Sequence, residues 1–216
     1  LVHGVHSMRA AQLANRFEET TGSRIMLREI FSHPKPAQLA ELLVTAEEYT
    51  PLPKAEEREY YPMSSAQKRI YLVCRMDEGG ISYNMPSSIR LRGEVRVEGL
   101  RAALQAMIDR HEVLRTAFLL VNGEPMQQIL PHAEADFTYL VDEDSTEEAL
   151  TAAFVQPFDL SKAPLIRMRL VKRRNDWLLQ IDTHHIVSDG MSEETFTKEF
   201  TALYNGERLA PQKRQY

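Results

Sequence analysis

The 216-residue sequence has a single cysteine, Cys74, so it cannot form a disulfide within itself. It also lacks any apolar run that approaches the roughly 18–20 residues of a membrane-spanning helix, and its first residues do not resemble a signal peptide. Positive charge is not in excess: the formal net charge is −5, and no lysine/arginine block offsets it. These absences predict a reducing, cytosolic location, no membrane association and no general affinity for nucleic acids.

What the sequence does contain is typical of a folded globular protein, with 43% hydrophobic and 26% charged residues. Residues 7–44 show helical periodicity. Ser7 is placed to cap a first helix, Gly22 to end it, and Pro36 to begin a second helix after a short turn over residues 25–31. Because the chain starts without an initiator methionine, we expect a fragment of a longer protein.

A proline-rich, charged stretch over residues 45–62 shows little apolar periodicity and predicts an extended linker. Residues 63–216 alternate between helical and strand patterns, with more hairpins than a strict βαβ protein would have. Asn122-Gly123 predicts one hairpin turn, and a second is expected near residues 175–176. The positions expected to be buried are Ile89 and Leu91 on a strand and Leu100, Leu104, Met107 and Ile108 on a helix. The last helix is expected to run from a cap at Ser192 to Gly206.

The stretch THHIVSDG, residues 183–190, is the strongest candidate for chemistry. Strand alternation predicts that His184 and His185 point to opposite faces, so one can face a cleft while the other anchors the strand. Histidine suits proton transfer near neutral pH, but two ordinary strand-end histidines before a turn explain the pattern equally well. A metal site would need His184, His185 and Asp189 to converge, and it is not favoured, because adjacent strand histidines diverge and the sequence has no further Cys/His cluster. A serine hydrolase is not favoured either, because Ser188 lacks the Gly-x-Ser-x-Gly turn.

Three further candidates also have simple structural explanations. A phosphodiester on Ser7 would be stabilised by the positive end of the helix, although a plain capping serine accounts for the same residue. Within RHEVLRTAF, residues 110–118, Glu112 and Arg115 are spaced as a solvated i, i+3 ion pair. Cys74 is expected to be a small buried residue rather than a nucleophile.

The order of these motifs is more informative than any one of them. SSAQKRIYL, then RHEVLRTAF, then HHIVSDGMS resembles the first three signature motifs of the condensation domains of nonribosomal peptide synthetases. Upstream, GVHSMRAAQLANRF followed by LREIFSHPKPAQLAELL resembles the C-terminal two-thirds of a peptidyl carrier protein.

This resemblance implies an α+β chain in three parts. Residues 1–44 would form part of a helical carrier bundle, 45–62 the linker, and 63–216 the N-terminal lobe of a condensation domain. That lobe would be a chloramphenicol-acetyltransferase-like α/β fold with a mixed sheet. The chain would lack the carrier's first helix and the second lobe of the condensation domain, and Val5 stands where the carrier family usually has a second glycine.

The resemblance also implies an activity, the formation of an amide between two carrier-bound thioesters without metal or ATP. His185 would accept a proton from the attacking amine or position that amine, and His184 would support it. Asp189 would hold the loop through an arginine, for which Arg110 and Arg115 are the candidates.

Further roles follow from the same resemblance. The Gly190 amide could help to stabilise the oxyanion, and Ser7 would carry 4′-phosphopantetheine, added by a phosphopantetheinyl transferase. The implied partners are an upstream adenylation domain, a downstream carrier domain and the second lobe. The motifs are closer to the subtype that takes an L-configured donor, and the absence of a DxxxxD pattern argues against a cyclising domain. Two alternatives stay open: a CoA-dependent acyltransferase of the HHxxxDG type, and a non-catalytic carrier–condensation fragment.

Overall fold

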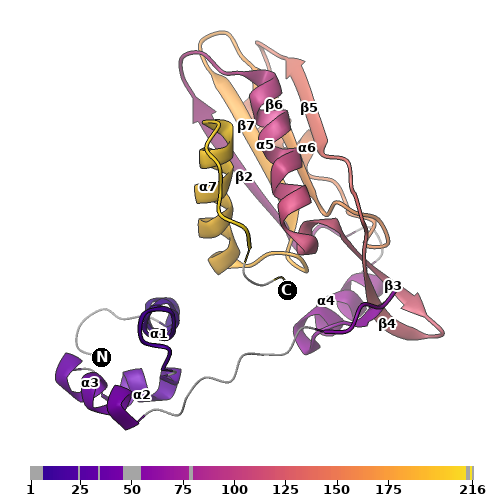
Figure 1. Ribbon diagram of the computed structural model, residues 1–216. Coiled ribbons are helices and arrows are strands. Elements are labelled where there is room, and N and C mark those ends of the chain that lie inside the picture. Colours follow the sequence, from indigo (N-terminus) through magenta and orange to yellow (C-terminus); the bar gives the residue numbers. More distant parts are fainter. Residues whose placement is uncertain are drawn as a thin grey trace. The chain divides into compact units, whose positions relative to one another are not determined.

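A computed structural model of the chain divides after Glu57 into two compact units, which are described separately (Figure 1). The residues that it describes are 7–23, 25–33, 35–45, 55–77, 80–212 and 215. Within this described part, no helix combines the length and the apolar character needed to cross a membrane. Val5 lies outside it.

The first unit consists of three helices: α1 (Ser7–Thr21), α2 (Leu27–Ser32) and α3 (Pro36–Thr45). Its small core contains Ala10, Ile25, Ile30 and Leu39. Gly22, at φ +70°, ends α1, and Pro36 begins α3, as predicted.

The segment predicted as a turn between α1 and α3 was assigned wrongly, because it contains α2. The Glu29 carboxylate accepts a hydrogen bond from the Met26 amide at 2.7 Å, which satisfies a free N–H at the start of this short helix. Ile30 is buried and anchors the helix to the core. Six residues are too few for apolar periodicity to reveal a helix.

The second unit contains two sheets and the remaining helices. Its elements are β1 (Tyr61–Pro62), α4 (Ser65–Met76), β2 (Asn84–Leu91), α5 (Val97–Arg110), the 3₁₀ turn η1 (Glu112–Arg115), β3 (Thr116–Val121), β4 (Glu124–Ile129), β5 (Asp136–Val141), α6 (Glu147–Phe154), β6 (Ile166–Lys172), β7 (Trp177–His184) and α7 (Gly190–Tyr204). The larger sheet has the order β2-β7-β6-β5, in which β5 and β6 are parallel and the other pairs antiparallel. This confirms the predicted mixed sheet.

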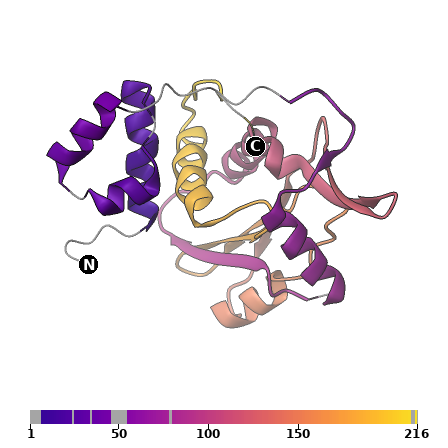
Figure 2. The same ribbon diagram turned by 90° about the horizontal axis from the view of Figure 1, so that it is seen from below.

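Helices cover both faces of the larger sheet. On one face, α5 and α7 pack over it, and α6, the crossover between the parallel strands, lies on the other (Figures 1 and 2). Alternation divides the strand residues accordingly, because Leu179 joins the core under α5 whereas Leu178 packs with Leu150 of α6. The predicted apolar stripe of α5 is fully buried. This double cover holds β7, and thus its terminal His184, in a rigid frame.

Three local expectations need correction. Ile89 was expected to be buried but is 46% exposed, because β2 is an edge strand of the sheet. Tyr61 and Pro62 were assigned to the linker, but they pair with β4 as strand β1. The helix α7 begins at Gly190, so Ser192 lies inside it rather than at its cap. The Asn122-Gly123 hairpin is confirmed, with φ of +53° and +83°.

Helix α4 begins with a reciprocal capping arrangement. Ser64 Oγ accepts from the Gln67 amide at 3.3 Å, and Gln67 Oε1 accepts from the Ser64 amide at 2.9 Å. We expect Ser64→Ala to lower the free energy of unfolding by about 1 kcal/mol, measured by urea denaturation. The neighbouring Ser65→Ala is the control, since it removes the hydroxyl of an exposed residue in the first turn. Equal losses in the two variants would contradict the capping role.

Candidate active site

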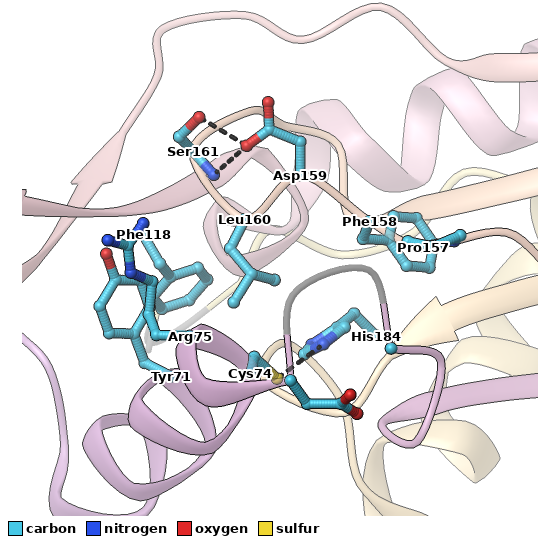
Figure 3. A pocket seen from close by; sticks show the side chains of 12 residues that line it. Tyr71, Cys74, Arg75, Phe118, Pro157, Phe158, Asp159, Leu160, Ser161 and His184 are labelled. Atoms are coloured by element: carbon cyan, nitrogen blue, oxygen red, sulfur yellow. Dashed lines mark hydrogen bonds between the residues drawn. The ribbon is translucent and has the colours of Figure 1, made fainter.

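The last residue of β7, His184, lies inside the second unit with 4% of its surface exposed. Its Nε2 atom is 3.6 Å from Cys74 Sγ, and Figure 3 shows the ring pointing toward that cysteine. The rings of Tyr83 and Phe158 lie 6.2 Å and 6.0 Å away between centroids, with Phe158 nearly perpendicular to the imidazole. His184 is therefore a packed, interior side chain.

The contacts of His184 determine which ring nitrogen carries its proton. Nδ1 lies 3.2 Å from the Ile186 amide nitrogen, which can only donate. The proton of the neutral ring therefore sits on Nε2, which donates toward Cys74 Sγ. Burial, and then the neighbouring charge of His185, lower the pKa of His184 to about 4, so the ring is neutral at pH 7. In this state it orders the turn that follows β7.

Cys74 lies on α4 and is half-buried. Burial, followed by the charge of Asp77, raises the pKa of its thiol. The thiol is therefore protonated at neutral pH, which agrees with the prediction that this residue is not a nucleophile.

His185 differs sharply from its neighbour, because its side chain is exposed. The strand ends at His184, so a turn rather than strand alternation orients His185. Its amide donates to the Tyr83 carbonyl at 2.8 Å, and the two rings meet edge to face at 6.5 Å. Ile186 and Val187, which follow it, are buried. The hydrogen bond to Tyr83 and the buried side chains of Ile186 and Val187 thus fix the turn, while the imidazole of His185 stays accessible.

The Asp189-Gly190 pair leads from this turn into α7. Asp189 Oδ1 accepts hydrogen bonds from both the amide and the hydroxyl of Ser192, each at 2.8 Å. Asp189 therefore caps α7, and Gly190 is the first residue of that helix. Backbone N–H groups in the first turn of a helix have no partners within it, so they can receive negative charge.

The two candidate arginines form ion pairs elsewhere in the second unit. Arg110 donates to both carboxylate oxygens of Glu199 at 2.9 Å and 3.2 Å, and His111 Nε2 lies 2.6 Å from the same carboxylate. Although burial acts to raise the pKa of Glu199, these hydrogen bonds lower it overall. Arg115 lies 3.5 Å from Glu112, the predicted i, i+3 pair, and both side chains are partly buried rather than solvated. The arginine partner of Asp189 stays a prediction.

Between α4 and the loop before β6 lies a cavity of about 300 Å³ (Figure 3). Its lining includes Tyr71, Cys74 and Arg75 from α4, Phe158 from the loop, and His184. Sequence reasoning did not predict that Cys74 and His184 meet, because 110 positions separate them. Asp182, a charged residue on the same buried face of β7 as His184, was also not predicted as part of the site, although strand alternation places it on that face.

The first residue of α1 is Ser7, the predicted attachment site. The first turn of this 15-residue helix has no acidic residue, and Arg9 in that turn is exposed. A phosphodiester at this end would therefore meet the positive helix terminus, with no carboxylate in the first turn to repel it. These residues fit a phosphopantetheine group.

The buried state of His184 has a consequence for stability. Its pKa falls from 6.5 in the unfolded chain to about 4 in the fold, so the unfolded state binds the proton more readily between these values. The neutral ring therefore makes its full contribution to the free energy of unfolding above pH 6.5. As the pH falls from 6.5 to 4, the free energy of unfolding drops by about 3 kcal/mol. We expect His184→Gln to flatten the pH dependence of unfolding free energy by about this amount. An unchanged slope in the variant would contradict the assignment.

Comparison with known proteins places two family models on the chain. The model of the condensation domain matches residues 57–216, and that of the phosphopantetheine attachment site matches residues 2–43. Bacitracin synthase 3 of Bacillus licheniformis is 39% identical over 217 residues, covering 99% of this chain and 3% of the relative. Gramicidin S synthase 2 of Brevibacillus brevis is 39% identical over 218 residues, covering 99% and 5%. The chain thus spans a small part of these relatives.

Solved structures agree with the family match. The X-domain from teicoplanin biosynthesis, in complex with OxyB, has a TM-score of 0.68 and 27% identity, covering 75% of this chain and 37% of that one. The starter condensation domain of the rhizomide synthetase has a TM-score of 0.62 at 23% identity, covering 71% and 42%, and so shows the fold alone. The chain belongs to the condensation-domain family of nonribosomal peptide synthetases, and a phosphopantetheine-binding carrier segment precedes that domain.

Proposed function

We propose that the second unit is one lobe of a domain that forms an amide between a donor acyl group and an acceptor amine, with His185 at the reacting centre. The observation that carries the proposal is the contrast between the two histidines. His184 is buried and neutral, whereas His185 is exposed on a turn that buried neighbours hold in place.

The chemistry requires a group of this kind. An α-amino group has a pKa of about 7.7–8.0, so it must reach the carbonyl neutral and lose a proton as the bond forms. His185 can accept that proton or hold the amine in line with the carbonyl. The Gly190 amide, at the start of α7, is a candidate to stabilise the oxyanion. Asp189 holds this helix start in position through Ser192.

The carrier segment would bring the donor. Phosphopantetheine, when bound, supplies a thiol that carries an acyl group as a thioester. Ser7 would be its attachment point, at a helix start with no acidic residue in the first turn. Because the carrier precedes the condensation domain, we propose that it serves the donor side. Tethering both reactants would supply much of the rate through proximity.

The proposed partners follow from this assignment. A phosphopantetheinyl transferase would modify the carrier, an upstream adenylation domain would load it, and a downstream carrier would present the amine. A second lobe would complete the channel, since the chain covers only 37–42% of the structural relatives described above. We propose that the protein acts in the cytosol, where coenzyme A and aminoacyl adenylates are available.

The test offers the donor acyl group in two forms to the full-length protein that contains this chain. One form is attached to the carrier segment, the other is a coenzyme A thioester, and the acceptor amine is on a downstream carrier. We expect the amide to form from the carrier-bound donor. Equal use of the coenzyme A thioester would favour a CoA-dependent acyltransferase. No amide from either form would favour a non-catalytic fragment.

A further inference from the structure

The loop between α6 and β6 packs against the histidine motif, and Arg167 of β6 holds it there. The guanidinium of Arg167 donates to the carbonyls of Gln156 and Pro157 at 2.9 Å and 3.3 Å. Its carbon atom lies 3.7 Å from the centre of the Phe158 ring, in a cation–π contact. One side chain therefore holds three consecutive loop residues.

Phe158 transmits this contact to the motif. Its edge meets the ring of His184 at 6.0 Å, and both side chains line the cavity in Figure 3. Backbone hydrogen bonds tie the later part of the loop to neighbouring strands at the Leu160 and Leu165 carbonyls, whereas side-chain contacts hold the segment from residue 156 to Phe158. Without Arg167, Phe158 would lose its stacking partner and the preceding Pro157 carbonyl would lose its guanidinium donor, while the Gln156 carbonyl would keep only its bond from Asn84.

A buried carboxylate holds Arg167 in turn. Asp182 is completely buried on β7, two residues before His184, and its Oδ2 atom lies 3.7 Å from Arg167 Nε. Asn84 donates to the same oxygen at 2.7 Å and to the Gln156 carbonyl at 2.9 Å. Burial raises the pKa of Asp182, while the Asn84 hydrogen bond and the charge of Arg167 oppose that effect. The network therefore links three strands to one loop.

We propose that Arg167 is a positioning residue for the reacting histidine. It holds Phe158 against His184, which fixes the His184 ring, and the ring fixes the turn through its hydrogen bond with the Ile186 amide. That turn carries His185. The expected effect on activity rests on the proposed function, whereas the expected effect on the His184 ring and on the turn after β7 does not depend on it.

The chain offers a matched control in Arg169, on the same face of the same strand. Its guanidinium also stacks on a phenylalanine, at 4.8 Å from the centre of Phe154, and donates to Gln180 Oε1 and the Leu150 carbonyl. Burial lowers the pKa of both arginines. Arg169 therefore reproduces the burial, stacking and hydrogen bonding of Arg167 without touching the loop before β6.

The experiment compares Arg167→Met with Arg169→Met in the 216-residue chain. Imidazole nitrogen shifts report the tautomer of His184, and hydrogen exchange reports the protection of the Ile186 amide. For Arg167→Met we expect a mixed tautomer population and Ile186 exchange at least about tenfold faster, beyond any change in global stability. For Arg169→Met we expect neither change. Arg167→Lys serves if Arg167→Met does not fold, because it keeps the charge but loses planar stacking and the paired donors.

Three results would overturn the proposal: an unchanged His184 and Ile186 in the Arg167 variants, equal changes in Arg169→Met, or full rescue by lysine. In the full-length protein, Arg167→Met should lower kcat for amide formation and leave KM for both carriers within about twofold, which is the pattern of lost positioning rather than lost binding. If the wild-type protein makes no amide, the proposed function fails while the nitrogen shifts and the exchange rates still decide the role of Arg167.

Discussion

Replacing His185 with alanine in the full-length protein is expected to slow amide formation by about 10²- to 10⁴-fold, the usual contribution of a positioned acid or base. The His185 side chain is exposed, and the next two residues of the turn, Ile186 and Val187, are buried and hold it in place. Removing the imidazole should therefore leave the fold intact. The measurement is a single-turnover assay with donor and acceptor both loaded on carriers, quenched over time and read as amide product.

The control for this variant is His132→Ala, which removes a surface imidazole that is 67% exposed and lies in a loop of the same unit. It should condense at the wild-type rate. His185→Gln separates the two possible roles, because glutamine can hold the amine by a hydrogen bond but cannot accept its proton. A wild-type rate in His185→Ala would show that the accessible histidine takes no part in the reaction.

Ser7→Ala is expected to abolish phosphopantetheine attachment completely. Incubation of the 216-residue chain with coenzyme A and a promiscuous phosphopantetheinyl transferase should add the mass of one phosphopantetheinyl group. The variant should gain none, because no other hydroxyl would stand at the start of α1. Intact-protein mass spectrometry measures both.

Ser32→Ala is the matched control for attachment. Ser32 is an exposed serine of the same unit at the end of α2, where the helix terminus carries partial negative charge. Its variant should be modified like the wild type. A mass gain that survives Ser7→Ala, or no gain in the wild type, would refute the assignment of the attachment site.

Much of the second unit was predictable because its elements are long and strongly patterned. The stripe from Leu100 to Ile108 defined α5, and Asn122-Gly123 defined a hairpin whose positive φ angles those residues tolerate. The predictions were wrong where burial or helix formation depends on contacts with other parts of the chain. Whether Ile89 is buried depends on what covers β2, and α2 depends on a cap and one buried side chain rather than on periodicity.

The candidate site was likewise predictable only in part. Alternation correctly predicted that the two histidines would have separate environments, although the strand ends at His184 and a turn orients His185. The contacts of Cys74 and Phe158 with His184 join segments far apart in the sequence, and a single sequence carries no signal for such pairs. The cap of α7 was assigned to Ser192 for a similar reason. Both Asp189 and Ser192 have side chains that can cap a helix, and it is the turn after β7 that places Asp189 at the helix start.

The most direct test follows the donor acyl group from one carrier to the other in a single turnover. It uses the full-length protein with an acyl group on Ser7 and an aminoacyl group on a downstream carrier. Mass spectrometry follows the masses of both carrier peptides over time. We predict that the wild-type protein moves the acyl mass from the Ser7 peptide to the downstream carrier as an amide, whereas His185→Ala retains it on Ser7. Loss of the acyl group to water without any gain on the downstream carrier, or equal transfer in the variant, would contradict the account.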